Sequence, residues 1–529
     1  MAETAVFAHA AVAAPHRFAA EAGRDVLAQS GDAIEATVAM AATISVVYPH
    51  NVSIGGDGFW LIREPNGRVR AIEACGCAGQ GASIAAYRAL GFDAVPLRGA
   101  KAALTVPGAI GGWALALELS RARGGRLPLP LLLDDAIRRA RDGYPVSASE
   151  ARFDPRRDAD LIAAPGFAEA FLVDGKPAAV GATRRATRLA DTLEHVARAG
   201  LDDFYRGDAA RELAADLERI GSPIARNDLA RYRARWREPL SLRLKTATLY
   251  NTPAPTQGVA SLIILGIYER LRPPKPEGFA HAHALIEATK RAMAIRDRAC
   301  VDFDHATHDF DALLSPANLD REAAKIDLRR AAPWPPKPDR GGTVWMGAID
   351  RDGLAVSFIQ SVYMDYGSGC LLPRTGVLMQ NRGAAFSLDP QARNPLTPGR
   401  RPYHTLNPPL AAFADGRALA YGSKGADGQP QFQAQVFTRI AAGETLEAAL
   451  AAPRHFFTGG LGEPAATVKL EEGYDDSVAS ALAAAGHAIE WKGAAERDLF
   501  GHAGALMRSP KGAIAAAHDP RSDGGAAGL

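Results

Sequence analysis

Cysteine is scarce in this sequence: four residues among 529, scattered along the chain, are too few for a disulfide framework. Cys75 and Cys77 flank a single glycine, which is not the spacing of the usual zinc or redox pairs, so we predict two small core thiols. His281 and His283 lie two apart in a helical pattern and therefore point to different faces. We predict no metal site and no cofactor.

No charge of one sign dominates either. Lys and Arg number 61 and Asp and Glu 59, and the resulting charge of +2 is too small to attract nucleic acid or an anionic membrane. No segment reaches the ~18 consecutive apolar residues of a membrane span. The N-terminus lacks a basic stretch followed by an apolar one. These absences predict a cytoplasmic protein without nucleic-acid or membrane partners.

What the sequence does contain is a strand, a turn and a strand between residues 341 and 369. Apolar, β-branched and aromatic residues flank the turn at 350–353, where Gly353 is available for a positive φ. Just upstream, residues 331–340 are rich in proline and basic, which is typical of an exposed linker. Thr343 therefore opens a predicted buried hairpin directly after an exposed segment.

A threonine in this place can be a nucleophile. Cleavage after Gly342 would give Thr343 a free α-amine, whose pKa lies near neutrality and which can act as the base for its own hydroxyl. The alternative is an ordinary strand threonine that follows a domain linker. The residues of the hairpin alone leave both interpretations open.

Further segments occur in a characteristic order along the chain: 22–23, 33–36, 49–50, 54–59, 106–108, 112–113, 204–207, 237–240, 253–258 and 519–524. Together with the hairpin they resemble the γ-glutamyltransferase family over nearly the whole chain. In that family a threonine begins the small subunit of an N-terminal nucleophile hydrolase. The resemblance is specific because of the ordered set, since each segment alone is a weak signal.

The resemblance implies an α+β fold, a four-layer αββα sandwich, in a precursor that cuts itself between Gly342 and Thr343. The products would be a large subunit, residues 1–342, and a small subunit, residues 343–529, and the processed pair could form a homodimer. Strand-rich stretches with helices before and after them suit such a sandwich. Val344 and Trp345 differ from the residues usual in the family, so an uncleaved, catalytically silent binding protein is the alternative of another class.

The same resemblance assigns catalytic roles. The loop at 422–428 follows a predicted strand and precedes a helix, a place where backbone N–H groups can converge on an anion. By resemblance, the amides of Gly425 and Ala426 form the oxyanion hole, and the hydroxyl of Ser361 steadies the Thr343 amine. Without the resemblance, the loop would be a plain turn between a strand and a helix.

The substrate-binding positions depart from the family pattern. Where the transferases hold the α-carboxylate and α-amine of a glutamyl group with an arginine and an aspartate, this sequence has Cys75 and Ala385. The other replacements are Tyr363 for an asparagine, Arg382 for a neutral amide, and His404 and Thr405 for a pair of serines. Losing the arginine and the aspartate removes the two charge-assisted contacts that define a free α-amino acid.

Arg382 without a matching acid suggests a substrate that is an anion and has no amine. This pattern resembles a branch of the family that hydrolyses oxamate, and we predict an amidohydrolase that cuts a small carboxylate-bearing amide. A γ-glutamyltransferase or glutathione hydrolase is the alternative, which would apply if another acid such as Asp389 reached the pocket. Arg382 could also be an exposed loop residue without any role in binding.

Overall fold

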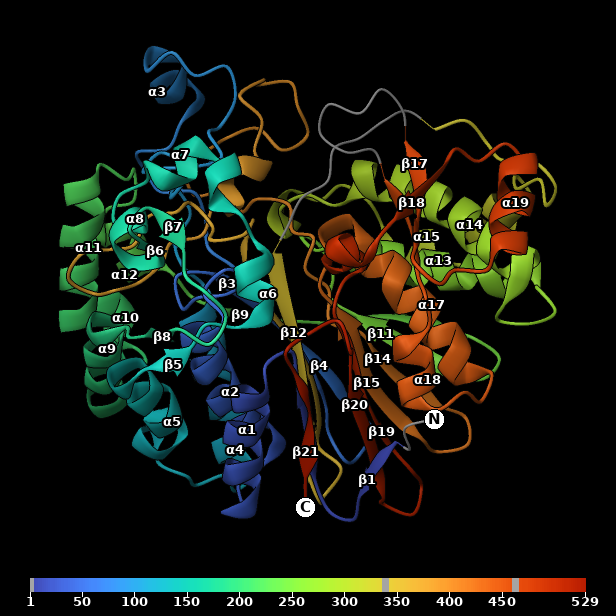
Figure 1. The fold of residues 1–529 in the computed structure, drawn as a ribbon, viewed down its shortest axis with the longest axis horizontal. Helices are drawn as coiled ribbons and strands as arrows, with labels where there is room; N and C mark the ends of the chain where they lie inside the picture. Colours follow the sequence, from blue (N-terminus) through green and yellow to red (C-terminus); the bar gives the residue numbers. More distant parts are fainter. Residues whose placement is uncertain (1–3, 335–341, 459–465) are drawn as a thin grey trace.

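Two seven-stranded sheets occupy the centre of the protein, with helices on both flanks (Figure 1). The structure is a computed structural model that describes residues 4–334, 342–458 and 466–529. Neighbouring strands in both large sheets are antiparallel. The predicted mixture of helices and sheets is thus confirmed. Within the described ranges, no helix has the length and apolar character that a membrane span needs.

The first sheet contains the predicted hairpin, and we call it the hairpin sheet. Its strands, in spatial order, are β21 (Gly525–Gly528), β2 (Ala11–Ala14), β12 (Gly342–Ile349), β13 (Ala355–Tyr363), β3 (Asp57–Arg63), β4 (Val69–Ala74) and β9 (Arg235–Arg237). The second, which we call the loop sheet, has the order β1 (Ala5–Phe7), β20 (Ile514–His518), β19 (Ala503–Arg508), β15 (Ala418–Ser423), β14 (Leu410–Phe413), β11 (Ala247–Asn251) and β10 (Leu240–Arg243).

Smaller sheets lie outside these two. One joins β16 (His455–Thr458), β17 (Thr467–Glu471) and β18 (Ile489–Lys492). The others are two-stranded and pair β5 (Tyr144–Pro145) with β8 (Thr183–Arg184), and β6 (Leu172–Val173) with β7 (Lys176–Pro177).

Helices pack on the outer face of each large sheet (Figure 1). Those on the side of the hairpin sheet are α1 (Arg17–Ala28), α2 (Ala33–Val47) and α4 (Ala109–Ala122), with α5 (Leu129–Asp142) and α9 (Thr187–Ala199) beyond them. Those on the side of the loop sheet are α13 (Gly258–Leu271), α14 (Gly278–Ala299), α17 (Gln429–Ala441) and α18 (Leu446–Ala451), with α16 (Pro316–Ala323) and α19 (Asp476–Ala484) beyond them. The helix α11 (Asp208–Ile220) packs against α9. Short helices of four to six residues are α3 (Ile84–Ala89), α6 (Ala148–Arg152), α7 (Ala159–Ile162), α8 (Phe167–Phe171), α10 (Asp203–Arg206), α12 (Arg226–Arg231) and α15 (Phe310–Leu314).

The predicted hairpin is β12 and β13, and Thr343 is the second residue of β12. Gly353 in its turn has a φ of +86°, as the turn requires. The upstream linker, predicted at 331–340, is described only for residues 331–334. The rest of it, from 335 onwards, lies outside the described residues.

Both faces of β12 are buried, and successive side chains alternate between two environments. Val344 and Met346 belong to the core beneath the helices that cover the hairpin sheet. Trp345 lies in the core shared with the loop sheet, and its indole N–H donates to Ser357 Oγ over 2.9 Å. A side chain at Gly422 of β15 would meet the Trp345 ring, so a glycine is needed there for the two sheets to approach. Val344 and Trp345 are therefore packing residues.

The carboxylate of Asp350 joins the hairpin turn to α2. It is buried and accepts hydrogen bonds from Ala33 N at 3.1 Å and Leu354 N at 3.0 Å. Burial raises its pKa from 3.8 to about 6, although these N–H donors act in the opposite direction. Between pH 3.8 and about pH 6, Asp350 is more protonated in the folded chain than in the unfolded chain. This group therefore makes folding less favourable as pH rises through that range.

We expect Asp350→Asn to gain stability relative to the parent chain as pH rises from 4 to 7. The relative gain should be roughly 3 kcal/mol at most, because the variant has no buried carboxylate to ionise. Thermal unfolding midpoints measured in a Thr343→Ala background, which removes the threonine hydroxyl, provide the test. Asp352→Asn, in the exposed part of the same turn, is the control. A stability difference that does not change with pH would contradict this assignment.

Candidate functional site

Thr343 is buried at the start of β12, with 2% of its surface exposed. Its hydroxyl lies 2.8 Å from the carbonyl oxygen of Gly342 and 3.3 Å from Ser361 Oγ. Ser361 Oγ also makes a short hydrogen bond to the Gly342 carbonyl and accepts from Tyr363 N at 2.7 Å. The structure thus brings both predicted hydroxyls to the carbonyl of the predicted cleavage site.

The pairing of β12 with β13 is irregular at this point. Gly342 pairs with Tyr363, but Val344 pairs with Gln360, so the register shifts between the two. Such a bulge changes the direction of side chains next to it. Here it lies at Thr343, at the edge of the regular part of the hairpin, and Tyr363 has a φ of +81°.

Asn51 contacts Thr343 from the large-subunit side of the predicted cleavage site. Its side-chain Oδ1 accepts a hydrogen bond from Thr343 N at 3.2 Å. Asn51 was not among the residues predicted from the sequence, although it directly follows the segment 49–50 of the family resemblance. Nothing in the sequence shows that the loop after α2 and the start of β12 meet, because the two are nearly 300 positions apart.

The loop after β15 has an unusual backbone at the two predicted oxyanion donors. Gly425 and Ala426 have φ values of +123° and +42°, both uncommon for side-chain-bearing residues. Among the described residues, the N–H groups of neither residue donate to a protein acceptor. The loop is held by Gln257, whose Nε2 donates to Ala426 O at 2.7 Å. The two predicted oxyanion donors are therefore left available.

Arg382 is buried, with 2% of its surface exposed, so the interpretation as an exposed loop arginine is wrong. Its Nη1 donates to Thr405 Oγ1 at 3.2 Å, and its guanidinium lies 3.5 Å from the centre of the Tyr363 ring. Its Nε has no hydrogen-bond partner, and within the described part of the chain Arg382 forms no ion pair with a carboxylate. A buried cation without a counter-charge is costly, so an anion is expected to bind there.

His404 neighbours Arg382 and is completely buried. Its Nε2 lies 3.3 Å from Asp57 Oδ2. Burial lowers its pKa to about 4, an effect that Asp57 opposes and Arg382 reinforces. The imidazole is therefore neutral near pH 7. The other oxygen of Asp57 accepts from Gly76 N, Gly108 N and Gln380 Nε2 at 3.0–3.1 Å, so this acid is committed to the surrounding loops.

Gln257 connects the predicted substrate-binding residue Thr405 to the predicted oxyanion donor Ala426. Its Nε2 donates to Thr405 O as well as to Ala426 O, each at 2.7 Å. Its Oε1 accepts from Arg296 Nη1 at 2.9 Å. Gln257 lies in the segment 253–258 of the family resemblance, but no role was predicted for it from the sequence. The predicted residues Arg382, Thr405 and Ala426 thus belong to one hydrogen-bonded assembly.

Cys75 and Ala385 stand at the two positions where the resemblance places the charged residues that bind a glutamyl group, and neither is charged near pH 7. Cys75 is buried with Phe59, Ile359 and Leu406, and burial raises the pKa of its thiol well above the usual value. Cys77, by contrast, is partly exposed, so the prediction of two core thiols at 75 and 77 is correct for Cys75 and wrong for Cys77. The alternative acid Asp389 is exposed and accepts from Gln391 N at 2.9 Å.

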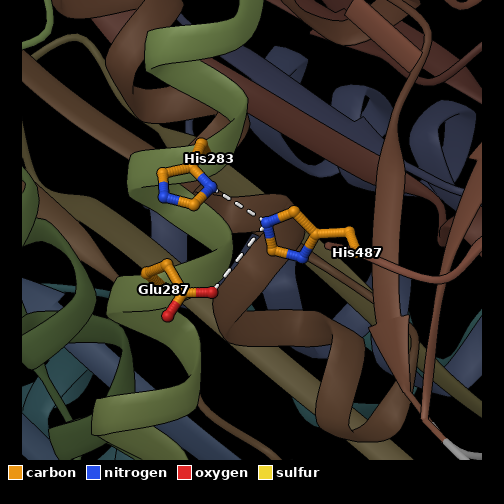
Figure 2. A group of neighbouring side chains, drawn as sticks. All are labelled: His283, Glu287 and His487. Atoms are coloured by element: carbon orange, nitrogen blue, oxygen red, sulfur yellow. Dashed lines mark hydrogen bonds and ion pairs between the residues drawn. The ribbon is translucent and has the colours of Figure 1, made fainter. Parts of the chain in front are cut away.

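Figure 2 shows a buried group of three possible metal ligands, His283, Glu287 and His487. His283 Nδ1 lies 2.9 Å from His487 Nε2, whereas His281 bonds Tyr268 instead, as expected for different helix faces. Both oxygens of Glu287 already have partners, because Lys290 Nζ lies 2.6 Å from Oε1 and Ala332 N donates to Oε2 over 3.3 Å. The ammonium opposes a second cation, so these residues fit a structural role beneath the chain that leads to the linker.

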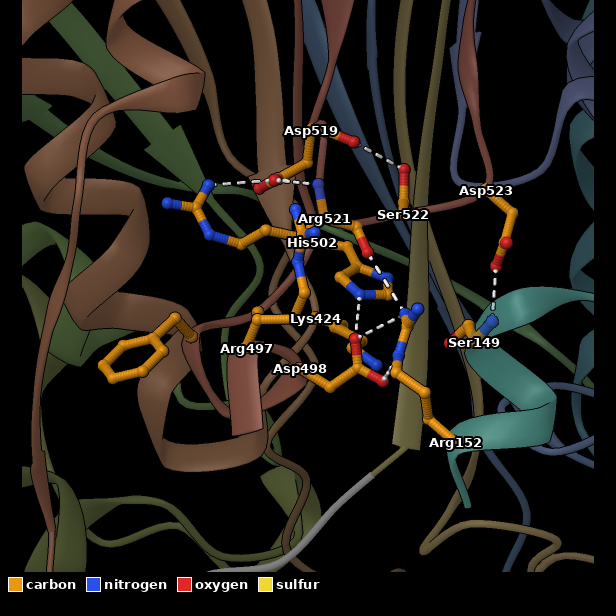
Figure 3. A network of polar contacts seen from close by, with 12 residues as sticks. Ser149, Arg152, Lys424, Arg497, Asp498, His502, Asp519, Arg521, Ser522 and Asp523 are labelled. Carbon is orange, nitrogen blue, oxygen red and sulfur yellow. Dashed lines mark hydrogen bonds and ion pairs between the residues drawn. The ribbon is translucent and has the colours of Figure 1, made fainter. Parts of the chain in front are cut away.

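Figure 3 shows a second polar network close to the start of β12. Asp498 accepts from Arg152 at 2.9 Å and from His502 at 2.9 Å, with Lys424 beside it. Burial alone would raise the pKa of Asp498, but Lys424, His502 and Arg152 hold it far below the usual range. Lys424 immediately precedes Gly425, so this network adjoins the loop of the predicted oxyanion donors.

The terminal segment 519–524 also has a structural explanation. Asp519 pairs with Arg454 at 2.7 Å and accepts from Ala503 N at 2.8 Å. Asp523 accepts from Ala148 N and Ser149 N, both at 3.0 Å, at the N-terminus of α6 (Figure 3). This segment therefore ties the C-terminal part of the chain to the N-terminal part close to the site.

We expect Ser361→Ala to slow cleavage after Gly342 by roughly ten- to a hundredfold, because the carbonyl loses a polarising hydrogen bond worth about 1.5–3 kcal/mol. Denaturing gels sampled over time measure the rate. Ser357→Ala, which removes another buried hydroxyl of β13, is the matched control and should cleave normally. Thr343→Ala should stay intact. Equal rates in Ser361→Ala and Ser357→Ala would refute this role of Ser361.

Comparisons with known proteins agree over the length of the chain. Residues 19–529 match the family described as gamma-glutamyltranspeptidase. The chain is 46% identical over 525 residues to the oxamate amidohydrolase proenzyme of Klebsiella pneumoniae, covering 99% of each protein. It is 34% identical over 522 residues to the glutathione hydrolase-like YwrD proenzyme of Bacillus subtilis, covering 98% of each. Its structure resembles that of cephalosporin acylase from Bacillus halodurans with a TM-score of 0.90 and 32% identity, covering 100% of this chain and 97% of that one.

Proposed function

Because this chain belongs to the γ-glutamyltranspeptidase family, we propose that it is the precursor of an N-terminal threonine amidohydrolase with the αββα sandwich of N-terminal nucleophile hydrolases. Cleavage between Gly342 and Thr343 divides it into subunits of residues 1–342 and 343–529. The two subunits stay together because the strands of the hairpin sheet come from both of them.

The first reaction is self-cleavage. Thr343 Oγ attacks the carbonyl carbon of Gly342, the peptide C–N bond breaks, and the nitrogen leaves as the α-amine of Thr343. Water then hydrolyses the ester that joins Gly342 to Thr343 Oγ. The proximity of the hydroxyl to the preceding carbonyl, and the short hydrogen bond from Ser361, support this step.

Substrate hydrolysis repeats the same chemistry on an external amide. The Thr343 amine takes the proton of Oγ, which attacks the amide carbonyl, and the N–H groups of Gly425 and Ala426 stabilise the oxyanion. Ammonia or an amine leaves with the proton, and water then resolves the acyl-enzyme. This mechanism needs no cofactor.

The buried guanidinium of Arg382, which has no carboxylate partner among the described residues, is the observation that carries the substrate assignment. A carboxylate next to the scissile amide would accept its free Nε–H and give it a counter-charge, with neutral His404 and the Thr405 hydroxyl as further partners. Oxamate, in which a carboxylate is bonded directly to the amide carbon, has this form. The relative from Klebsiella pneumoniae, described above, carries oxamate in its name.

A γ-glutamyl substrate fits the site less well. Its α-amine would need an acid, but Ala385 is at the family position, Asp389 is exposed and Asp57 is engaged by loop amides and His404. Leaving an ammonium without a partner in a closed site costs several kcal/mol. Glutathione hydrolysis is therefore the second candidate, favoured by the similarity to relatives that are named glutathione hydrolases or glutathione hydrolase-like.

We expect kcat/KM for oxamate to exceed that for a γ-glutamyl anilide by at least about a hundredfold. Arg382→Gln should lower kcat/KM for oxamate by on the order of a hundredfold or more, because the carboxylate loses a charge-assisted contact. Cleavage at Thr343 should continue in this variant. Arg374→Ala, which alters an exposed arginine paired with Glu212, is the control.

Several outcomes would overturn the proposal. A preference for the anilide by orders of magnitude would assign the enzyme to γ-glutamyl compounds. Full oxamate activity in Arg382→Gln would remove the basis of the substrate assignment. A chain that stays uncleaved and inactive after long incubation would support the catalytically silent binding protein instead.

A further inference from the structure

Asn51 occupies the loop between α2 and β3 and is completely buried. Its backbone is fixed at both ends of the residue, because its N–H donates to Tyr48 O at 3.1 Å and its carbonyl accepts from Val362 N at 3.4 Å. Val362 follows Ser361 in β13. Asn51 is therefore held against the strand that supplies the predicted hydroxyl, and its side chain reaches Thr343 from there.

The orientation of the Asn51 amide follows from its partner. A backbone N–H such as that of Thr343 can only donate, so the atom 3.2 Å away must be the carbonyl Oδ1. The Nδ2 amide group then points elsewhere, and it has no hydrogen-bond partner among the residues that the structure describes. Two N–H donors of Asn51 are thus available beside the predicted nucleophile.

We propose that Asn51 is the positioning residue for the catalytic amine. The nitrogen that it holds in the precursor is the same atom that becomes the α-amine when the Gly342–Thr343 bond breaks. This inference rests on the proposed function and extends it to the base. In the mature enzyme, Asn51 Oδ1 accepts one amine N–H, which turns the nitrogen lone pair toward Thr343 Oγ, so that it can receive the hydroxyl proton.

The same contact sets the protonation of the base. A carbonyl oxygen that accepts from the amine also accepts from its protonated form, and more strongly, because that form is charged. Only the neutral amine can take a proton from the hydroxyl. An acceptor with a full negative charge would therefore raise the pKa of the amine and move the acid limb of the kcat/KM profile to higher pH. Removing the acceptor would lower the pKa of the amine and move this limb to lower pH.

Asn51→Asp and Asn51→Leu separate these effects at nearly constant side-chain size. Asn51→Asp keeps an acceptor, so the chain should still cleave itself, and the acid limb should move up by about one pH unit. Asn51→Leu should lower kcat by about ten- to a hundredfold with KM changed less than about threefold, because the amine is no longer oriented. The substrate is whichever of oxamate and the γ-glutamyl anilide the parent enzyme hydrolyses faster.

Asn381→Asp is the matched control. The Oδ1 of Asn381 accepts from Met364 N at 3.1 Å, so this substitution also places a carboxylate on a buried backbone N–H, but not on that of Thr343. Its acid limb should stay at the parent position. The pH dependence with which the Thr343 amine reacts with an acylating reagent, followed on the N-terminal peptide by mass spectrometry, gives the amine pKa without any substrate.

The outcomes distinguish this inference from the proposed function. If the parent chain cleaves and is active, but the acid limb and the amine pKa of Asn51→Asp match those of the parent, Asn51 does not position the amine and only this inference fails. An equal displacement in Asn381→Asp would also refute it. If the parent chain shows no free amine at Thr343, both the inference and the proposed function fail.

Discussion

The close contact between the Thr343 hydroxyl and the preceding carbonyl is the constraint on which the rest of the site depends. It exists because β12 begins in a bulge of the hairpin sheet, with Val344 packed against the covering helices and Trp345 packed against the loop sheet. A buried strand cannot slide by one residue without moving every side chain to the other face. The packing of ordinary core residues therefore determines where the predicted nucleophile lies.

Around this fixed point, the surrounding groups divide the chemistry between them. Ser361 is hydrogen-bonded to the carbonyl of Gly342, and Asn51 accepts from the nitrogen of Thr343. In the loop that follows β15, the N–H groups of Gly425 and Ala426 have no acceptor among the described residues. Arg382 adds a cation without a counter-ion among the described residues. An anionic substrate would relieve the unfavourable burial of that charge, so under the proposed function Arg382 determines specificity rather than stability.

The sequence predicted much of this arrangement for identifiable reasons. The hairpin followed from a turn motif between apolar runs, and the resemblance to the family, which the comparisons confirm, located Thr343, Ser361 and the loop at 422–428. Asn51 and Gln257 were not predicted from the sequence, because their roles depend on contacts between segments that are distant along the chain. The burial of Arg382 also needed the structure, since a glycine- and alanine-rich segment gives no periodic signal of burial.

The central claim is that Thr343 is freed by cleavage and then carries the acyl group of the substrate. The direct test is to quench the enzyme with acid during turnover of oxamate and to locate the added mass by peptide mass spectrometry. We predict a small subunit that begins at Thr343 and bears the acyl group on that residue. An acyl group on another residue, or turnover by a chain that is still joined at Gly342, would contradict the account.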